Sequence, residues 1–315
     1  MPLPPKSPNQ STPQNASAPR SMRRILIVRL SAHGDLVQTL PLLADLKQHP
    51  DTQVGWLVEA SAAPLLANHP ELDYLHIAHR KDWLNQLKAR PWCLFSILRE
   101  VFSLIQEIRA VGYDYSMDVQ GLLKSAVWPF LCGIPTRMGY KNTRESADVF
   151  YNQPIPPHDM RDANTPTILK FRDFAHQLDQ TPNTVETIRF PLAPIPPEQE
   201  QTVSTLLADC MPEHPLLVIA PTTIWASKQW PTAHWVKLLT ALQDLPLNIG
   251  LIGAPNDMPT IEHLLETLPP NPSSVARYFN WCGQTRLPDL IALFHHADYF
   301  IGLDSASLHI ANAVA

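Results

Sequence analysis

The feature that most constrains this chain is an alternation of short apolar runs with longer helical patterns, and it occurs twice. The first series opens at Arg23 to Leu30, where an apolar run with basic ends predicts a strand buried on both faces of a parallel sheet. Strand and helix patterns then follow in turn up to Tyr140. Such alternation is typical of βαβ units and predicts a parallel sheet with helices on both faces.

A second series of the same kind begins at Leu216 to Ala220 and ends with a strand at Tyr299 to Leu303 and a helix from Ser305. The segment between the two series is rich in proline, which restricts φ and removes ladder donors, so it suits a connection better than a central strand. We therefore predict an α/β fold with two Rossmann-like domains facing a cleft. The predicted parts are a disordered tail (1–21), an N-terminal domain (22–150), a Pro-rich linker or crossover (151–197) and a C-terminal domain (198–315).

Composition excludes several classes of protein. A formal charge of -5 argues against a nucleic-acid partner bound through a broad basic surface. The four cysteines lie far apart with no CxxC pair, which predicts free thiols in a reducing compartment and no metal site. The sequence shows no signal peptide and no apolar run long enough to span a membrane, so we predict a cytoplasmic protein.

The loop after the first strand, Ser31 to Asp35, contains the first candidate for chemistry. Ligands of open α/β sheets bind beyond the carboxyl ends of strands, where helix N-termini also present free N–H groups. Asp35 is therefore either a helix N-cap or a functional carboxylate. The GxGxxG and GxxxxGK[ST] patterns are absent, as is the YxxxK of an epimerase, and this disfavours a nicotinamide-dependent dehydrogenase, an epimerase or a kinase.

Two further loops follow strands of the second series. Thr222 and Thr223, with Lys228 a few residues on, offer hydroxyls and a point charge suited to a diphosphate, or else form an exposed turn with a solvated lysine. Asp304 and Ser305 precede the last helix, and His309 lies one turn inside it. His309 is either a packing residue or, together with Ser305, part of a phosphate or ribose site.

Taken together these segments resemble the ADP-heptose:lipopolysaccharide heptosyltransferases, glycosyltransferase family 9, and most closely the heptosyltransferase I branch. The likeness rests on S-A-H-G-D after the first strand, T-T-x(4)-K-x-W-P from Thr222 and D-S-A-x-x-H from Asp304. Supporting matches are Trp56 to Glu59, Asp118 to Ser125 and Thr143 to Glu145. The resemblance covers Met22 to Ala315, and its one departure inside these motifs is Ala306, where the family usually has glycine.

The resemblance implies a GT-B fold and an inverting, metal-independent transfer of a heptose from ADP-heptose to an inner-core lipopolysaccharide sugar or similar acceptor, without a cofactor. The acceptor is lipid-linked, so the enzyme is expected to work at the inner leaflet of the inner membrane. By position Asp35 is the general base. The donor-binding residues are Thr222, Thr223, Lys228, Asp304, Ser305 and His309, and the acceptor-binding residues are Gln120, Lys124 and Arg144. The N-terminal domain would hold the acceptor and the C-terminal domain the nucleotide-sugar.

Those residue types suit the chemistry. One carboxylate suffices to deprotonate the attacking hydroxyl, and such general-base catalysis contributes about 10²- to 10⁴-fold. Lysine, hydroxyls and a helix N-terminus can stabilise the departing ADP. Separately, His79 to Trp92 mixes basic and aromatic residues, which suits an anionic lipid head group or a solvated helix face.

The chain stops at Ala315, before the Gly/Pro-rich loop and terminal helix found in the family. A sheet that lacks strands exposes an edge and apolar helix faces. We therefore expect the 315 residues to be a fragment of a genuine transferase. The alternative is a non-catalytic nucleotide- or sugar-binding remnant of such an enzyme.

Overall fold

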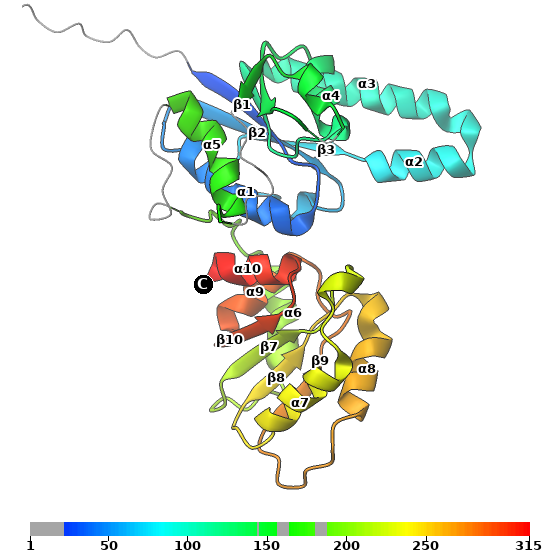
Figure 1. The fold of residues 1–315 in the computed structure, drawn as a ribbon, viewed down its shortest axis with the longest axis vertical. Coiled ribbons are helices and arrows are strands. Elements are labelled where there is room, and N and C mark those ends of the chain that lie inside the picture. The colour runs from blue at the N-terminus through cyan, green and yellow to red at the C-terminus, as the bar shows by residue number, and fades with distance from the viewer. Residues whose placement is uncertain (1–21, 144, 156–163, 180–187) are drawn as a thin grey trace, which may run out of the picture.

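The computed structural model describes residues 22–143, 145–155, 164–179 and 188–315, and it contains two parallel sheets. Figure 1 shows them as two halves of the molecule, one above the other. The predicted α/β fold with two Rossmann-like domains is confirmed. Residues 1–21, which we predicted to be disordered, lie outside the described ranges, as does Arg144.

The first half is built on a six-stranded sheet in the order β3-β2-β1-β4-β5-β6, with every neighbouring pair parallel. Its strands are β1 (Arg23–Val28), β2 (Thr52–Glu59), β3 (Tyr74–Ala78), β4 (Tyr115–Asp118), β5 (Thr136–Tyr140) and β6 (Gln153–Ile155). Its helices are α1 (His33–Leu46), α2 (Arg80–Ala89), α3 (Leu94–Val111), α4 (Leu123–Leu131) and α5 (Thr167–Asp179), with short 3-10 turns η1 (Ala63–Leu65), η2 (Pro91–Cys93) and η3 (Ala147–Phe150).

The second half is built on a four-stranded parallel sheet in the order β10-β7-β8-β9. Its strands are β7 (Leu216–Ala220), β8 (Asn248–Leu251), β9 (Arg277–Asn280) and β10 (Tyr299–Gly302). Its helices are α6 (Pro197–Leu207), α7 (Thr232–Leu242), α8 (Met258–Glu266), α9 (Asp289–His296) and α10 (Ala306–Val314), with 3-10 turns η5 (Ala226–Lys228) and η6 (Pro255–Asp257).

The central strand β1 shows why the sequence folds this way. Ile25, Leu26, Ile27 and Val28 are each 0% exposed. Successive side chains of a strand point to opposite faces, so alternate residues enter two different cores. Ile25 and Ile27 join the cluster that includes α1 and α5, whereas Leu26 and Val28 join the cluster that includes α3. The uninterrupted apolar run is thus explained by helices on both faces.

The two halves meet through α1 and α10, which face each other in Figure 1. Ile310 of α10 is fully buried, and it belongs to the same apolar cluster as Leu36 and Leu40 of α1. The cluster continues into the second sheet through Val218. Because one apolar core crosses from half to half, the loops that begin α1 and α10 are held close together.

The segment predicted as a Pro-rich linker, 151–197, contains structure that belongs to the first half. β6 adds a sixth strand at the sheet edge, where Pro154 is tolerated because an edge strand has donors that need no partner. α5 packs on α1, and Arg172 of α5 forms two hydrogen bonds with Asp45 of α1, at 2.7 and 2.9 Å. The proline-based interpretation missed β6, because the pairing of this strand with β5 is long-range.

Three observations apply to the described part of the chain alone. Its helices are too short or too polar to cross a membrane. The four cysteines are free. Within these residues, no group of three His, Cys, Asp or Glu side chains is placed to hold a metal ion.

Candidate active site

Both sheets place the sequence motifs at the same topological position. In each sheet the strand order reverses between the first strand and the fourth, at β1 and β4 in one half and at β7 and β10 in the other. Open α/β sheets bind ligands beyond the carboxyl ends of strands at such a switch point. The candidate residues that the structure describes lie in the loops after these four strands or in the first turn of the helix that follows each loop. Local sequence patterns and topology therefore agree on one location.

Asp35 is the third residue of α1, and the N-cap position is occupied by Ala32. The interpretation of Asp35 as a helix N-cap is therefore wrong. Acidic residues in the first turn are favoured by the positive end of the helix dipole, which explains why Asp35 is compatible with helix initiation. Its carboxylate is 42% exposed and forms an ion pair with Arg29.

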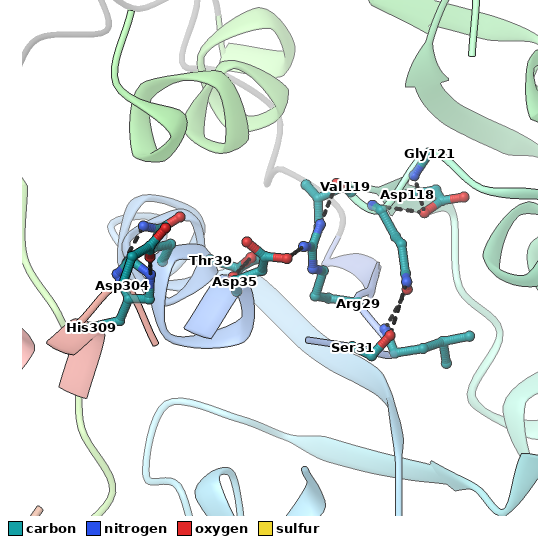
Figure 2. Close-up of polar contacts among 12 residues, drawn as sticks. Arg29, Ser31, Asp35, Thr39, Asp118, Val119, Gly121, Asp304 and His309 are labelled. Atoms are coloured by element: carbon teal, nitrogen blue, oxygen red, sulfur yellow. Dashed lines mark hydrogen bonds and ion pairs between the residues drawn. The ribbon is translucent and has the colours of Figure 1, made fainter. Parts of the chain in front are cut away.

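Arg29 comes directly after β1 and is almost completely buried. Its guanidinium donates to the backbone oxygen of Val119 at 3.0 Å, lies 5.0 Å from the ring centre of Phe171 and pairs with Asp35. Burial lowers the pKa of Arg29, while Asp35 and Asp118 act to raise it. A buried cation must be paired, so Arg29 fixes the carboxylate of Asp35 in the position that Figure 2 shows.

The acceptor-side candidates Gln120 and Lys124 converge on the loop before α1. Gln120 accepts a hydrogen bond from the backbone N–H of Leu30 at 2.9 Å and donates to the hydroxyl of Ser31 at 3.2 Å. The Lys124 ammonium donates to the same hydroxyl at 3.2 Å. Burial and the nearby cation of Arg80 lower the pKa of Lys124. The third candidate, Arg144, lies outside the described residues.

Asp118 at the end of β4 holds the loop that carries Gln120. Its carboxylate is 0% exposed. It accepts hydrogen bonds from four donors, the N–H groups of Gln120 and Gly121 and the hydroxyls of Ser125 and Tyr151, at 2.7 to 3.2 Å. Burial raises the pKa of Asp118 to about 6, although the four donors act in the opposite direction. This loop is therefore fixed by a buried, fully bonded carboxylate.

The donor-side candidates of the second half form a more open cluster. Lys228 in η5 and Asp304 after β10 form an ion pair at 2.5 Å, with 43% and 54% of their side chains exposed. Thr223 donates to the backbone oxygen of Asp304 at 3.3 Å, and Thr222 follows β7 beside it, partly exposed. Lys228 lowers the pKa of Asp304, and His309 adds to that effect. Ser305 occupies the N-cap of α10, but its hydroxyl bonds Ser307 and makes no cap.

His309 connects this cluster to the first half. Its ring lies 3.5 Å from Asp304 through Nε2 and 3.0 Å from the Gln38 amide through Nδ1. The ring also packs on Gly34, where an added Cβ would lie only 2.4 Å from it. Figure 2 shows Asp35 between the Asp304–His309 pair and Arg29. The base candidate Asp35 thus lies close to Asp304 and His309, which are 269 and 274 residues further along the sequence.

The chain was compared with known proteins. Residues 101–315 match the model of glycosyltransferase family 9 (heptosyltransferase). The chain belongs to this family. Lipopolysaccharide heptosyltransferase 1 of Pseudomonas aeruginosa is 31% identical over 232 residues, which cover 68% of this chain and 56% of that protein. Lipopolysaccharide heptosyltransferase 1 of Escherichia coli K12 is 27% identical over 249 residues, which cover 77% and 72%. The first alignment thus spans little more than half of the relative's length.

Solved structures of this family share the fold. The E. coli heptosyltransferase WaaC with ADP superposes with a TM-score of 0.71 at 22% identity, over 92% of this chain and 84% of that one. A glycosyl transferase family 9 protein from Veillonella parvula gives a TM-score of 0.73 at 15% identity, over 93% and 78%. The fold expected from the resemblance, GT-B with two Rossmann-like halves, is therefore confirmed.

Sequence reasoning assigned no role to three residues that build this site, which are Arg29, Gln38 and Asp118. A charged residue at the carboxyl end of a buried strand is a usable indication for Arg29 and Asp118, because a buried charge needs partners. Gln38 gave no such indication, since its partner His309 lies in the other half.

Proposed function

We propose that this chain carries the catalytic machinery of an inverting, metal-independent glycosyltransferase that moves a heptose from ADP-heptose to an inner-core lipopolysaccharide sugar or a similar acceptor. The observation that carries the proposal is the setting of Asp35. Its half-exposed carboxylate is oriented by the buried Arg29 and lies next to Gly34, on which His309 of the donor-side cluster packs.

In this proposal Asp35 is the general base. The acceptor hydroxyl gives its proton to the Asp35 carboxylate while its oxygen bonds to the anomeric carbon of the heptose. The bond from that carbon to the phosphate oxygen breaks at the same time, and ADP leaves with the electron pair. Attack opposite the leaving group inverts the anomeric configuration. A positioned base of this kind contributes about 10²- to 10⁴-fold.

The donor-side cluster would stabilise the charge that develops on ADP. The Lys228 ammonium and the hydroxyls of Thr222, Thr223 and Ser305 are groups that bind phosphate oxygens. Ser305 also begins α10, whose N-terminal dipole favours an anion. The Asp304 carboxylate accepts hydrogen bonds and is suited to sugar hydroxyls. Since Lys228 and Asp304 are paired without ligand, donor binding would exchange that ion pair for contacts with the nucleotide-sugar.

Gln120, Lys124 and Arg144 would bind the acceptor. The Lys124 ammonium, only partly exposed and directed at Ser31, is suited to an anionic group of the acceptor near the reacting hydroxyl. We propose that this acceptor is lipid-linked and that the enzyme works in the cytoplasm at the inner leaflet of the inner membrane.

The direct test is to supply the 315-residue chain with ADP-heptose and a lipid-linked inner-core acceptor in the presence of EDTA. We expect ADP release that depends on the acceptor, and a new glycosidic bond whose anomeric configuration by NMR is opposite to that of the donor. Retention of configuration would refute Asp35 as the base of a single displacement. ADP binding without any transfer would favour the non-catalytic remnant instead.

A further inference from the structure

A helical hairpin projects from the first half of the molecule. α2 leaves the sheet after β3, η2 turns the chain at Pro91–Cys93, and α3 returns it to β4. Figure 1 shows this hairpin extending sideways, away from α1 and the second half. A helix rises 1.5 Å per residue, so the ten residues of α2 place the turn roughly 15 Å from the sheet edge.

The far end of this hairpin exposes large apolar side chains. Trp92 is 78% exposed and Phe95 is 82% exposed. The exposed apolar side chains of the hairpin, defined here as the hairpin patch, are Leu84, Trp92, Leu94, Phe95, Leu98 and Phe102. Soluble proteins seldom leave such residues clustered in water, and an exposed apolar patch marks an interaction surface.

The four patch residues on α3 form one stripe, which does not belong to the core-facing side of this helix. At about 100° per residue, Leu94, Phe95, Leu98 and Phe102 fall within an arc of about 100°. The side of α3 that packs on the sheet is formed by other residues, Ile97, Leu104 and Ile108, which are buried. The helix thus has a second apolar stripe that packing within the described chain does not use.

Charge at the hairpin identifies the partner. Residues 84–99 contain three cations and no acidic residue, although the chain as a whole carries a formal charge of -5. The cations Lys88, Arg90 and Arg99 are all exposed. Exposed tryptophan and phenylalanine flanked by lysine and arginine match the interface of an anionic bilayer, where rings enter the head-group region and cations meet lipid phosphates.

We infer that the tip of the α2–α3 hairpin docks this protein on the surface of an anionic lipid bilayer. The base of the hairpin adjoins the acceptor side of the candidate site, because Arg80 and Lys81 at the start of α2 contact Glu59 at the end of β2. The Lys81 backbone N–H donates to Glu59 at 3.1 Å. That this docking presents a lipid-linked acceptor to Asp35 rests on the proposed function, whereas the docking itself does not.

The test is sedimentation of the full chain with vesicles of phosphatidylglycerol and phosphatidylcholine (1:1), and with phosphatidylcholine alone. A triple variant, Lys88→Gln with Arg90→Gln and Arg99→Gln, should bind the anionic vesicles on the order of 100-fold more weakly at low salt, at about fivefold per cation. A second variant, Trp92→Ser with Phe95→Ser, should bind at least tenfold more weakly at any salt concentration. Leu245→Ser with Val275→Ser is the control, since both are exposed apolar residues of the other half, at 47% and 46%.

Three results separate this inference from its rivals. Equal vesicle binding by all variants, or no binding by the parent chain, would overturn it. A parent chain that is dimeric by light scattering, with variants that become monomeric, would overturn it in favour of a second copy as the partner. ADP affinity and transfer to a delipidated, soluble acceptor should stay unchanged in every variant. If the proposed function is wrong, the parent chain itself will show no transfer, while its binding to vesicles will be unaffected.

Discussion

The two halves of the molecule use the same strand arrangement but fix their loops in different ways. In the first half, Asp118 is buried and accepts four hydrogen bonds, and Arg29 is buried against Asp35 and Val119. In the second half, Asp304 and Lys228 are about half exposed and are paired mainly with each other. The polar groups of the first half are therefore each held by several buried contacts, whereas Lys228 and Asp304 in the second half can exchange partners at little cost.

This difference suits the roles that the proposed function gives to the two halves. A general base must be aimed before the reaction, and burial of its neighbours reduces the number of positions available to Asp35. Phosphate-binding groups must release water and other partners when the nucleotide arrives, and exposed pairs contribute little to stability when they break. The comparison teaches that burial of the polar groups matters more than their identity. Buried polar neighbours hold one carboxylate in a fixed orientation, whereas exposed polar groups can exchange each other for a ligand.

The largest expected effect comes from replacing Asp35, the proposed general base in the first half. Asp35→Asn keeps the shape of the side chain but cannot take a proton, so the transfer rate should fall by about 10²- to 10⁴-fold. ADP affinity measured by calorimetry should stay unchanged, because the donor-side groups belong to the other half. The control is Asp51→Asn, an exposed aspartate in the turn before β2. Transfer within tenfold of the parent chain would remove Asp35 from the mechanism.

A second test concerns the buried carboxylate of the first half. The pKa of Asp118 is about 6 in the folded protein, above its ordinary value of 3.8. Between these pH values the folded state keeps a proton that the unfolded chain has released, so stability from this group falls as the pH rises. The total loss is roughly 3 kcal/mol, complete above about pH 6.

Asp118→Asn should remove that dependence. We expect the difference in unfolding free energy between parent and variant, measured in urea, to change by roughly 2.5 kcal/mol from pH 4 to pH 7, in favour of the variant at the higher pH. Taking the difference cancels the carboxylates that the two proteins share. Parallel pH profiles would show that Asp118 is already ionised throughout this range.

The third test concerns the exposed Lys228–Asp304 ion pair of the second half. Lys228→Ala would remove the proposed charge-assisted contact to the diphosphate. Such a contact contributes about 1.5 to 3 kcal/mol, so ADP affinity should fall by roughly 10- to 100-fold. Stability should change little, since the Lys228–Asp304 pair is exposed. Lys237→Ala on α7 is the matched control, because Lys237 is an exposed lysine in the same half. Equal ADP affinity in the two variants would place Lys228 outside the donor site.

More of the fold than of the candidate site could be predicted from the sequence. The apolar runs in β1 and β7 are local patterns, and both strands lie where predicted. The location of the motifs could also be predicted, because the loops after parallel strands meet at the carboxyl edge of the sheet. The contacts did not follow, since Gln38 and His309 are 271 residues apart and nothing near either residue indicates the other. Pro154 concealed an edge strand for the same reason, since the partner of β6 lies elsewhere in the chain. The helix start at Pro197 is different, because proline at the first helical position is itself a local indication of a helix.

The smallest expected effect lies where the halves touch. Gly34→Ala adds a methyl group 2.4 Å from the His309 ring, so the ring must move and lose its contact with Gln38. Overpacking of this kind costs about 1 to 3 kcal/mol, reduced here by the higher helix propensity of alanine, which favours folding by up to about 1 kcal/mol. In a His309→Ala background the obstacle is gone, and the same substitution should become neutral or stabilising. Urea unfolding of the four proteins in this double-mutant cycle measures the sign change, and an unchanged sign would mean that Gly34 and His309 do not touch in solution.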